Sequence, residues 1–191
     1  PGGQYVGTES DPLRVTSAAV TRSMLDVLGV QPERGRNFSA EEDLNGGPNV
    51  AIISHGLWQK GFGGTSDIIG KQILVNSNST TVIGVMPANF AFPPGSNDQV
   101  EVLLPFQFDP ANPGNRGSHF LSVIGRLKPG VTIPQAQSEM TSLMAGWKSE
   151  GRAQHLLNPE RHPVIMLGLH EDVVGSARKA VWLLMAAVAF V

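Results

Sequence analysis

The 191-residue chain contains no cysteine, and charged residues make up only 16% of it. The missing cysteines exclude disulfide bonds, thiolate catalysis and zinc sites built on cysteine. The net charge is −2 and no run of lysine or arginine occurs, which argues against a nucleic-acid-binding surface. The low charge predicts a surface that relies on serine, threonine, asparagine, glutamine and glycine.

No metal centre is predicted among the five histidines. His162 and His170 flank an apolar segment with the pattern of a strand, which would place them about 26 Å apart. A metal needs three or four converging donors. We therefore expect the histidines in exposed or loop positions. They are His55, His119, His155, His162 and His170.

No catalytic residue and no cofactor site is predicted either. Ser54 and His55 are adjacent, so their side chains would point apart, and helix capping is the expected role of Ser54. The acidic cluster Glu41–Asp43 lacks the spacing of a calcium loop and is expected to be solvated. A hydrolase site assembled from His119 and this cluster stays open as a minor alternative.

The segment GGTSDIIGKQ resembles a phosphate-binding loop but departs from it at two positions. That motif requires a glycine at position 65 and a serine or threonine at position 72, where this chain has Thr65 and Gln72. A turn that leads into a strand, KQILV, is expected instead.

Local patterns predict a β-α segment, then a β-rich middle, then a β-α-β segment. The first segment has a strand from Leu13 and a helix in TRSMLDVLG. The middle has a strand NVAIIS, a helix HGLWQKGF, a hairpin KQILVNSNSTTVIGVMP and a strand EVLLPF. The last has a strand in HFLSVIGRL, a helix in IPQAQSEMTSLMAGW and a strand in HPVIMLGLHEDVVG.

The predicted helix in IPQAQSEMTSLMAGW has the clearest local signals. Thr132 and Gln135 form a capping box at its start. Its apolar residues fall on one continuous stripe. Trp58 and Trp147 lie on apolar faces and are expected to anchor cores. The stripe consists of Ile133, Ala136, Met140, Leu143, Met144 and Trp147.

The predicted fold class is α+β with two lobes. Polar segments rich in glycine and proline, near residues 40–48 and 107–117, mark the expected boundaries. One discontinuous lobe would combine residues 1–46 and 118–178. A β-rich lobe of residues 47–117 would be inserted into it.

Three segments together resemble one family, the MacB-like periplasmic core domain of FtsX/MacB-type ABC transporter permeases. The first contains Leu28-Gly29-Val30 and Gly35-Arg36-x-Phe38. The second runs from Ser54 through Leu57-Trp58, Phe62-Gly63-Gly64, Ile69-Gly70-Lys71 and Val82–Pro87 to Phe90. The third is Arg126–Val131 with Ala136. The similarity covers about residues 10 to 191, and it is greatest to large acidobacterial permeases that carry two such domains.

The resemblance implies a non-enzymatic domain on the periplasmic side of the inner membrane. Residues 1–46 and 118–178 would form a porter-like lobe, and the domain would couple ATP-driven motion in the cytoplasm to partner or substrate handling. Implied partners are flanking transmembrane helices, a separate or fused ATPase, and a second copy of the domain or a periplasmic adaptor. The alternative is a free-standing extracytoplasmic ligand-binding module.

The C-terminal sequence RKAVWLLMAAVAFV ends in eleven apolar residues, Val181 to Val191. Eleven helical residues span about 16 Å, roughly half the apolar thickness of a bilayer. With the family resemblance, residues 179–191 are predicted to begin a transmembrane helix.

Overall fold

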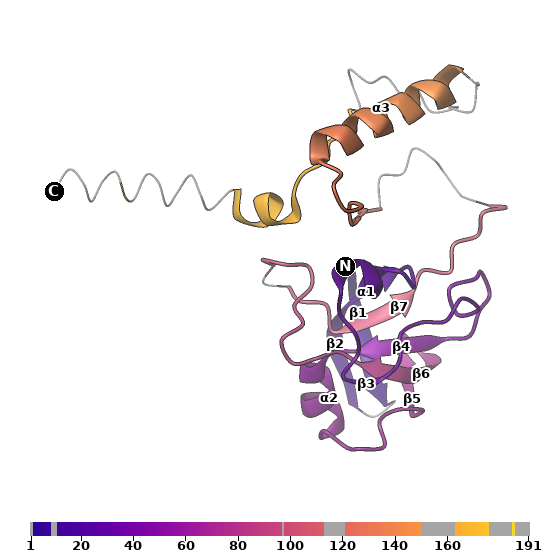
Figure 1. Cartoon of the computed structure of the whole chain (residues 1–191). Helices are drawn as coiled ribbons and strands as arrows, with labels where there is room; N and C mark the ends of the chain where they lie inside the picture. The colour runs from indigo at the N-terminus through magenta and orange to yellow at the C-terminus, as the bar shows by residue number, and fades with distance from the viewer. Residues whose placement is uncertain are drawn as a thin grey trace. The chain divides into compact units, whose positions relative to one another are not determined.

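The computed structural model describes residues 2–8, 11–96, 98–112, 121–149, 163–175 and 185. The chain divides into two compact units, Pro1–Gly114 and Asn115–Val191, and each is described by itself (Figure 1).

The first unit is built on one seven-stranded sheet, with the strand order β3-β6-β4-β7-β2-β1-β5. β5 also pairs with β6, so six of these strands close into a ring, and β3 is added beside the C-terminal end of β6. Neighbours are antiparallel except for β2–β7 and β4–β6. The strands are β1 Gly2–Thr8, β2 Asp11–Val20, β3 Arg34–Gly35, β4 Val50–Ile53, β5 Gln72–Val75, β6 Asn78–Val85 and β7 Val102–Pro105.

Turn chemistry explains how the β5–β6 hairpin closes. Asn76 and Ser77 connect the two strands with φ angles of 47° and 68°. Positive φ at both central residues is the geometry of the two-residue turn that matches the twist of paired strands. The predicted hairpin over KQILVNSNSTTVIGVMP is therefore confirmed.

Two apolar cores lie on the two faces of this sheet. Inside the ring, residues of β1, β2, β4, β5, β6 and β7 pack with Leu57 and Trp58 of α2 (His55–Phe62). Outside it, α1 (Met24–Leu28) places Leu25 against the outer face of β4, β6 and β7. β4 is buried on both faces because its alternate residues enter the two cores.

Local residues determine where α2 begins and where α1 ends, whereas Ser23, before α1, makes no side-chain capping hydrogen bond. The Ser54 hydroxyl accepts a hydrogen bond from the Leu57 amide at 3.1 Å and caps α2. Gly29 follows α1 with a φ of 71°, as a left-handed C-terminal residue. Trp58 is buried, as expected, and Phe38 is buried as well.

The second unit contains α3, Ile133–Ser149, which confirms the predicted helix. The capping box is present: the Thr132 amide donates to Gln135 Oε1 at 2.8 Å, and the Gln135 amide donates to the Thr132 hydroxyl at 3.4 Å. The predicted burial of Trp147 is wrong, because this side chain is 47% exposed.

Two strands predicted in this unit are not formed in its described residues. Residues 121–128 and 163–168 have no regular structure, and residues 169–175 are helical. The side chain of Gln137 accepts from the Met166 amide at 2.7 Å and donates to the Val164 carbonyl. The backbone groups of Val164 and Met166 thus bond to a side chain of α3 and not to a neighbouring strand. An apolar sequence alone does not produce a strand here.

The predicted lobes can be compared with this layout only in part. β1 and β2, from residues 1–46, share the sheet with β4 to β7, from residues 47–117. The association of residues 1–46 with 118–178 stays a prediction. Across the described residues, no helix has both the length and the apolar character that crossing a bilayer requires. The predicted membrane segment 179–191 lies outside the described residues except for Met185.

Candidate functional site

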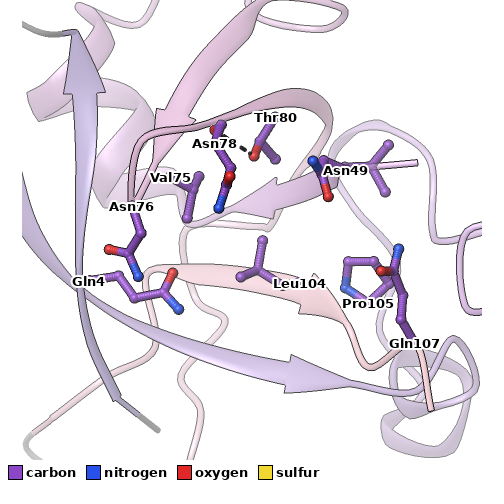
Figure 2. Close-up of a pocket in the computed structure, with 10 residues that line it drawn as sticks. Gln4, Asn49, Val75, Asn76, Asn78, Thr80, Leu104, Pro105 and Gln107 are labelled. Atoms are coloured by element: carbon purple, nitrogen blue, oxygen red, sulfur yellow. Dashed lines mark hydrogen bonds between the residues drawn. The ribbon is translucent and has the colours of Figure 1, made fainter. Parts of the chain in front are cut away.

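A pocket of about 190 Å³ opens at one end of the strand ring, where β4 and β6 begin and β5 and β7 end (Figure 2). Only Ser54 separates the end of β4 from α2, so α2 lies toward the end of the ring opposite the pocket. We call this the mouth pocket. Its lining residues are Gln4, Asn49, Val50, Val75, Asn76, Asn78, Thr80, Leu104, Pro105 and Gln107.

Strand periodicity explains why the pocket is polar while the core beneath it is apolar. Alternate residues of a strand share one face. On β6 the inward sequence runs Asn78, Thr80, Val82, and on β1 it runs Gln4, Val6. Each strand thus becomes more polar toward the mouth. The apolar floor is provided by Val75 and Leu104, which also pack against the inner core.

Hydrogen bonds hold part of the lining in place. Asn76 Oδ1 accepts from the Tyr5 amide at 3.0 Å, and the Thr80 hydroxyl donates to the Asn78 carbonyl at 3.1 Å (Figure 2). Gln107 Nε2 donates to the carbonyls of Glu42 and Pro48 at 3.1 and 3.2 Å.

One polar atom of the lining has no partner in the described part of the protein. Gln4 Oε1 is buried and has no hydrogen-bond partner among the described residues. A buried polar atom without a partner is costly, so a site for water or a ligand is expected there. None of the lining side chains carries a charge.

The acidic cluster predicted to be solvated is organised around a buried carboxylate. Glu42 is 5% exposed, and Arg36 donates to both of its oxygens at 2.7 and 2.9 Å. The Ser39 amide adds a third hydrogen bond at 2.7 Å. These contacts, led by Arg36, lower the pKa of Glu42 below its ordinary range. The prediction of a solvated loop is therefore wrong for Glu42. Its carboxylate is buried because Arg36, six residues earlier, pairs with it.

The calcium alternative gains no support from this cluster. The Arg22 amide donates to Asp43 Oδ2 at 3.0 Å, and the Ser39 hydroxyl donates to Glu41. Each carboxylate is thus directed to a protein donor. Over the part of the chain that the structure describes, no group of three or more potential metal ligands converges.

His55 lies in a small cluster at the start of α2. Its Nδ1 is 2.6 Å from a Glu33 oxygen, and its ring meets Trp58 edge-on at 5.4 Å. The Arg34 guanidinium lies over the Trp58 ring at 4.7 Å. Trp58 Nε1 donates to the Thr65 carbonyl at 2.9 Å. These contacts attach β3 and the 63–71 loop to α2, which is a structural role.

The remaining candidate residues form no second site in the described chain. His170 is exposed, whereas His119, His155, His162 and Trp182 lie outside the described residues. The segment that resembles a phosphate-binding loop is a turn region in which the Gly70 amide donates to the Val82 carbonyl, before β5 begins. The predicted turn is confirmed.

The mouth pocket was missed at the sequence level. Its lining residues are uncharged and spread over 104 positions, from Gln4 to Gln107, and no local motif unites them. One signal could have indicated it. On alternate positions the residues change from apolar to polar toward a strand end, from Val82 to Thr80 and Asn78, and from Val6 to Gln4.

Comparisons with known proteins agree on one family. The chain matches the family model of the MacB-like periplasmic core domain over residues 2–143. The macrolide export ATP-binding/permease protein MacB of Rhodospirillum rubrum is 29% identical over 108 residues. That alignment covers 56% of this chain and only 16% of the relative.

Solved structures share the fold. The periplasmic region of MacB from Actinobacillus actinomycetemcomitans has a TM-score of 0.53 at 16% identity, covering 78% of this chain and 64% of that one. A domain of a Porphyromonas gingivalis protein described as a permease has a TM-score of 0.55 at 22% identity, covering 80% and 68%.

Proposed function

The chain belongs to the MacB-like periplasmic core domain family, and from that membership we propose that it is a non-enzymatic domain of an ABC-type permease. In this proposal it lies on the periplasmic side of the membrane. There it transmits ATP-driven motion from the cytoplasm to periplasmic partners or substrates. The family match over residues 2–143 is the observation that carries the proposal.

The construction of the first unit supports a mechanical role. Six strands close into a ring, and apolar cores lie on both faces of β4. Densely packed cores deform little under load. A unit of this kind can pass a displacement applied at one end to its other end.

The proposed partners follow from the same family membership. They are flanking transmembrane helices, a separate or fused ATPase, and a second copy of the domain or a periplasmic adaptor.

The absence of cysteine provides a test of location in the full-length protein. Lys60 is exposed near the end of α2. Lys60→Cys, in a full-length protein otherwise free of cysteine, should react in intact cells with a maleimide reagent that crosses the outer but not the inner membrane. Protection until the inner membrane is permeabilised would refute the periplasmic location.

Coupling to ATP is tested with the same position. With a second copy of the domain as the partner, spin labels on Lys60→Cys of the two copies in the reconstituted full-length transporter should show a different distance distribution with and without ATP. An unchanged distribution, in a preparation that hydrolyses ATP, would refute mechanical coupling by this unit.

The alternative, a free-standing ligand-binding module, is favoured by the presence of the mouth pocket. Fractionation of cells that express the full-length gene separates the two functions. Recovery with the inner membrane supports the permease domain, and recovery in the soluble periplasmic fraction supports the module.

A further inference from the structure

We propose that the mouth pocket binds one sugar ring of a neutral saccharide. This inference goes beyond mechanical coupling, and either function can hold without the other. It rests on the composition, size and shape of the pocket.

The absence of charge in the lining selects the class of ligand. A phosphate, carboxylate or ammonium group would lose its hydration on entering and would find no side chain of opposite charge among the lining residues. A neutral ligand with both donors and acceptors has matching partners. Amide side chains present a donor and an acceptor a short distance apart, and neighbouring hydroxyls of a sugar have the same arrangement.

Several polar atoms are free to make these bonds. Gln4 Oε1 has no partner among the described residues but is buried from solvent, so the Gln4 side chain must rotate to present it. Asn76 uses its oxygen on the Tyr5 amide, which leaves its NH₂ group as a donor. Gln107 uses its NH₂ group on two carbonyls, which leaves its oxygen as an acceptor. The pocket therefore offers acceptors and donors at fixed positions.

Size and shape favour a single ring over an extended chain. The volume of about 190 Å³ lies below the roughly 300–1,000 Å³ of pockets that hold drug-sized ligands, which limits the occupant to a small group. Val75 and Leu104 close the floor, where they join the inner core. A closed depression accepts the end of a ligand, whereas an extended peptide needs a groove that is open at both ends.

The experiment is a titration of the isotope-labelled full chain, followed by NMR. The probes are methyl α-glucopyranoside, methyl α-galactopyranoside and N-acetylglucosamine at millimolar concentrations. For at least one probe we expect saturable shifts in the side-chain amide signals of Gln4, Asn49, Asn76, Asn78 and Gln107. The amide signal of Asn89, an exposed residue outside the lining, should stay unchanged.

Matched variants assign the effect to the pocket. Asn78→Ala should weaken binding about tenfold, as expected for the loss of one hydrogen-bonding side chain. Asn89→Ala should leave it unchanged. Asn49→Ala is the second pocket variant if Asn78→Ala disturbs the β5–β6 hairpin, because Asn49 precedes β4 and lies outside the strands.

Three outcomes would overturn the proposal. The first is the absence of saturable pocket shifts with all three sugars. The second is an equal or larger response to N-acetylalanine methylamide, which would assign the pocket to peptide groups. The third is tighter binding of glucose 6-phosphate than of the neutral glycosides, which would contradict the argument from charge.

Discussion

At the scale of single residues, the Glu42 carboxylate shows how a polar loop becomes a fixed part of the structure. Arg36 and the Ser39 amide supply three hydrogen bonds to it. The Glu42 carbonyl in turn accepts from Gln107. The buried carboxylate thus fixes the loop that follows β3, and the Glu42 backbone carbonyl connects that loop to Gln107, at the rim of the mouth pocket.

This arrangement predicts a pH-dependent contribution to the stability of the fold. The pKa of Glu42 is lowered in the folded chain, mainly by Arg36. The contribution is therefore complete above the unfolded pKa of about 4.3, and it is lost as the pH falls through the lower folded pKa. Glu42→Gln should cost about 1–2 kcal/mol at pH 7, and this penalty should shrink as the pH falls through the lowered folded pKa of Glu42.

Urea unfolding of both chains between pH 3 and pH 7 measures this difference. Glu41→Gln is the control, because Glu41 is exposed and should have a smaller effect on unfolding. A Glu42→Gln penalty that persists unchanged at pH 3 would show that the ionised carboxylate is not its source.

Gly35 and Gly46 form a second comparison between single residues. Both have a φ of 74°. A Cβ atom on Gly35 would lie 2.0 Å from the Ile83 carbonyl oxygen, whereas one on Gly46 would meet nothing within 4 Å. Gly46→Ala therefore adds only the cost of left-handed backbone, about 1–2 kcal/mol. Gly35→Ala should cost about 3 kcal/mol or more, because β3 must also move away from β6.

The free energy of unfolding in urea is again the measurement for the two glycine variants. Equal penalties would mean that β3 can separate from β6 without cost, and the close approach of these strands would then contribute nothing to stability.

At the scale of elements, the two short helices differ in how they begin. Ser54 has extended backbone and caps α2 through its hydroxyl, but Ser23, the residue before α1, makes no capping hydrogen bond. Ser54→Ala should therefore destabilise the chain by about 1 kcal/mol, and Ser23→Ala by less than about 0.5 kcal/mol.

Thermal unfolding of both serine variants checks this prediction. If the two substitutions lower the melting temperature equally, the Ser54 hydroxyl does not act as a cap.

Elements with strong local signals were predictable from the sequence. The turn at Asn76 and Ser77, the cap at Ser54 and the capping box at Thr132 each depend on residues within a few positions. β1 was not predicted, because its strand is defined by pairing with β2 and β5 more than by its glycine-rich sequence. The closure of the ring and the mouth pocket depend on such distant pairings as well.

At the scale of the whole molecule, the two units differ in how much apolar surface they bury. Every strand pairing in the described chain lies between residues 2 and 105. The buried residues of the inner core lie between Val6 and Val102, and those of the outer core lie between Val20 and Leu103. Beyond Gly114, Ala136 is the only buried apolar side chain among the described residues. Ile133, Leu143 and Trp147, on the stripe of α3, are all exposed.

The last prediction follows from this difference in burial. A chain of residues 1–114 should unfold in one cooperative thermal transition, because it retains all the described strand pairings and both cores. A chain of residues 115–191 should unfold without a cooperative transition, because Ala136 is the only buried apolar side chain in the described part of that unit. Circular dichroism melting of the two chains tests both statements. If residues 1–114 fold only when residues 118–178 are also present, the discontinuous porter-like lobe gains support over an independent first unit.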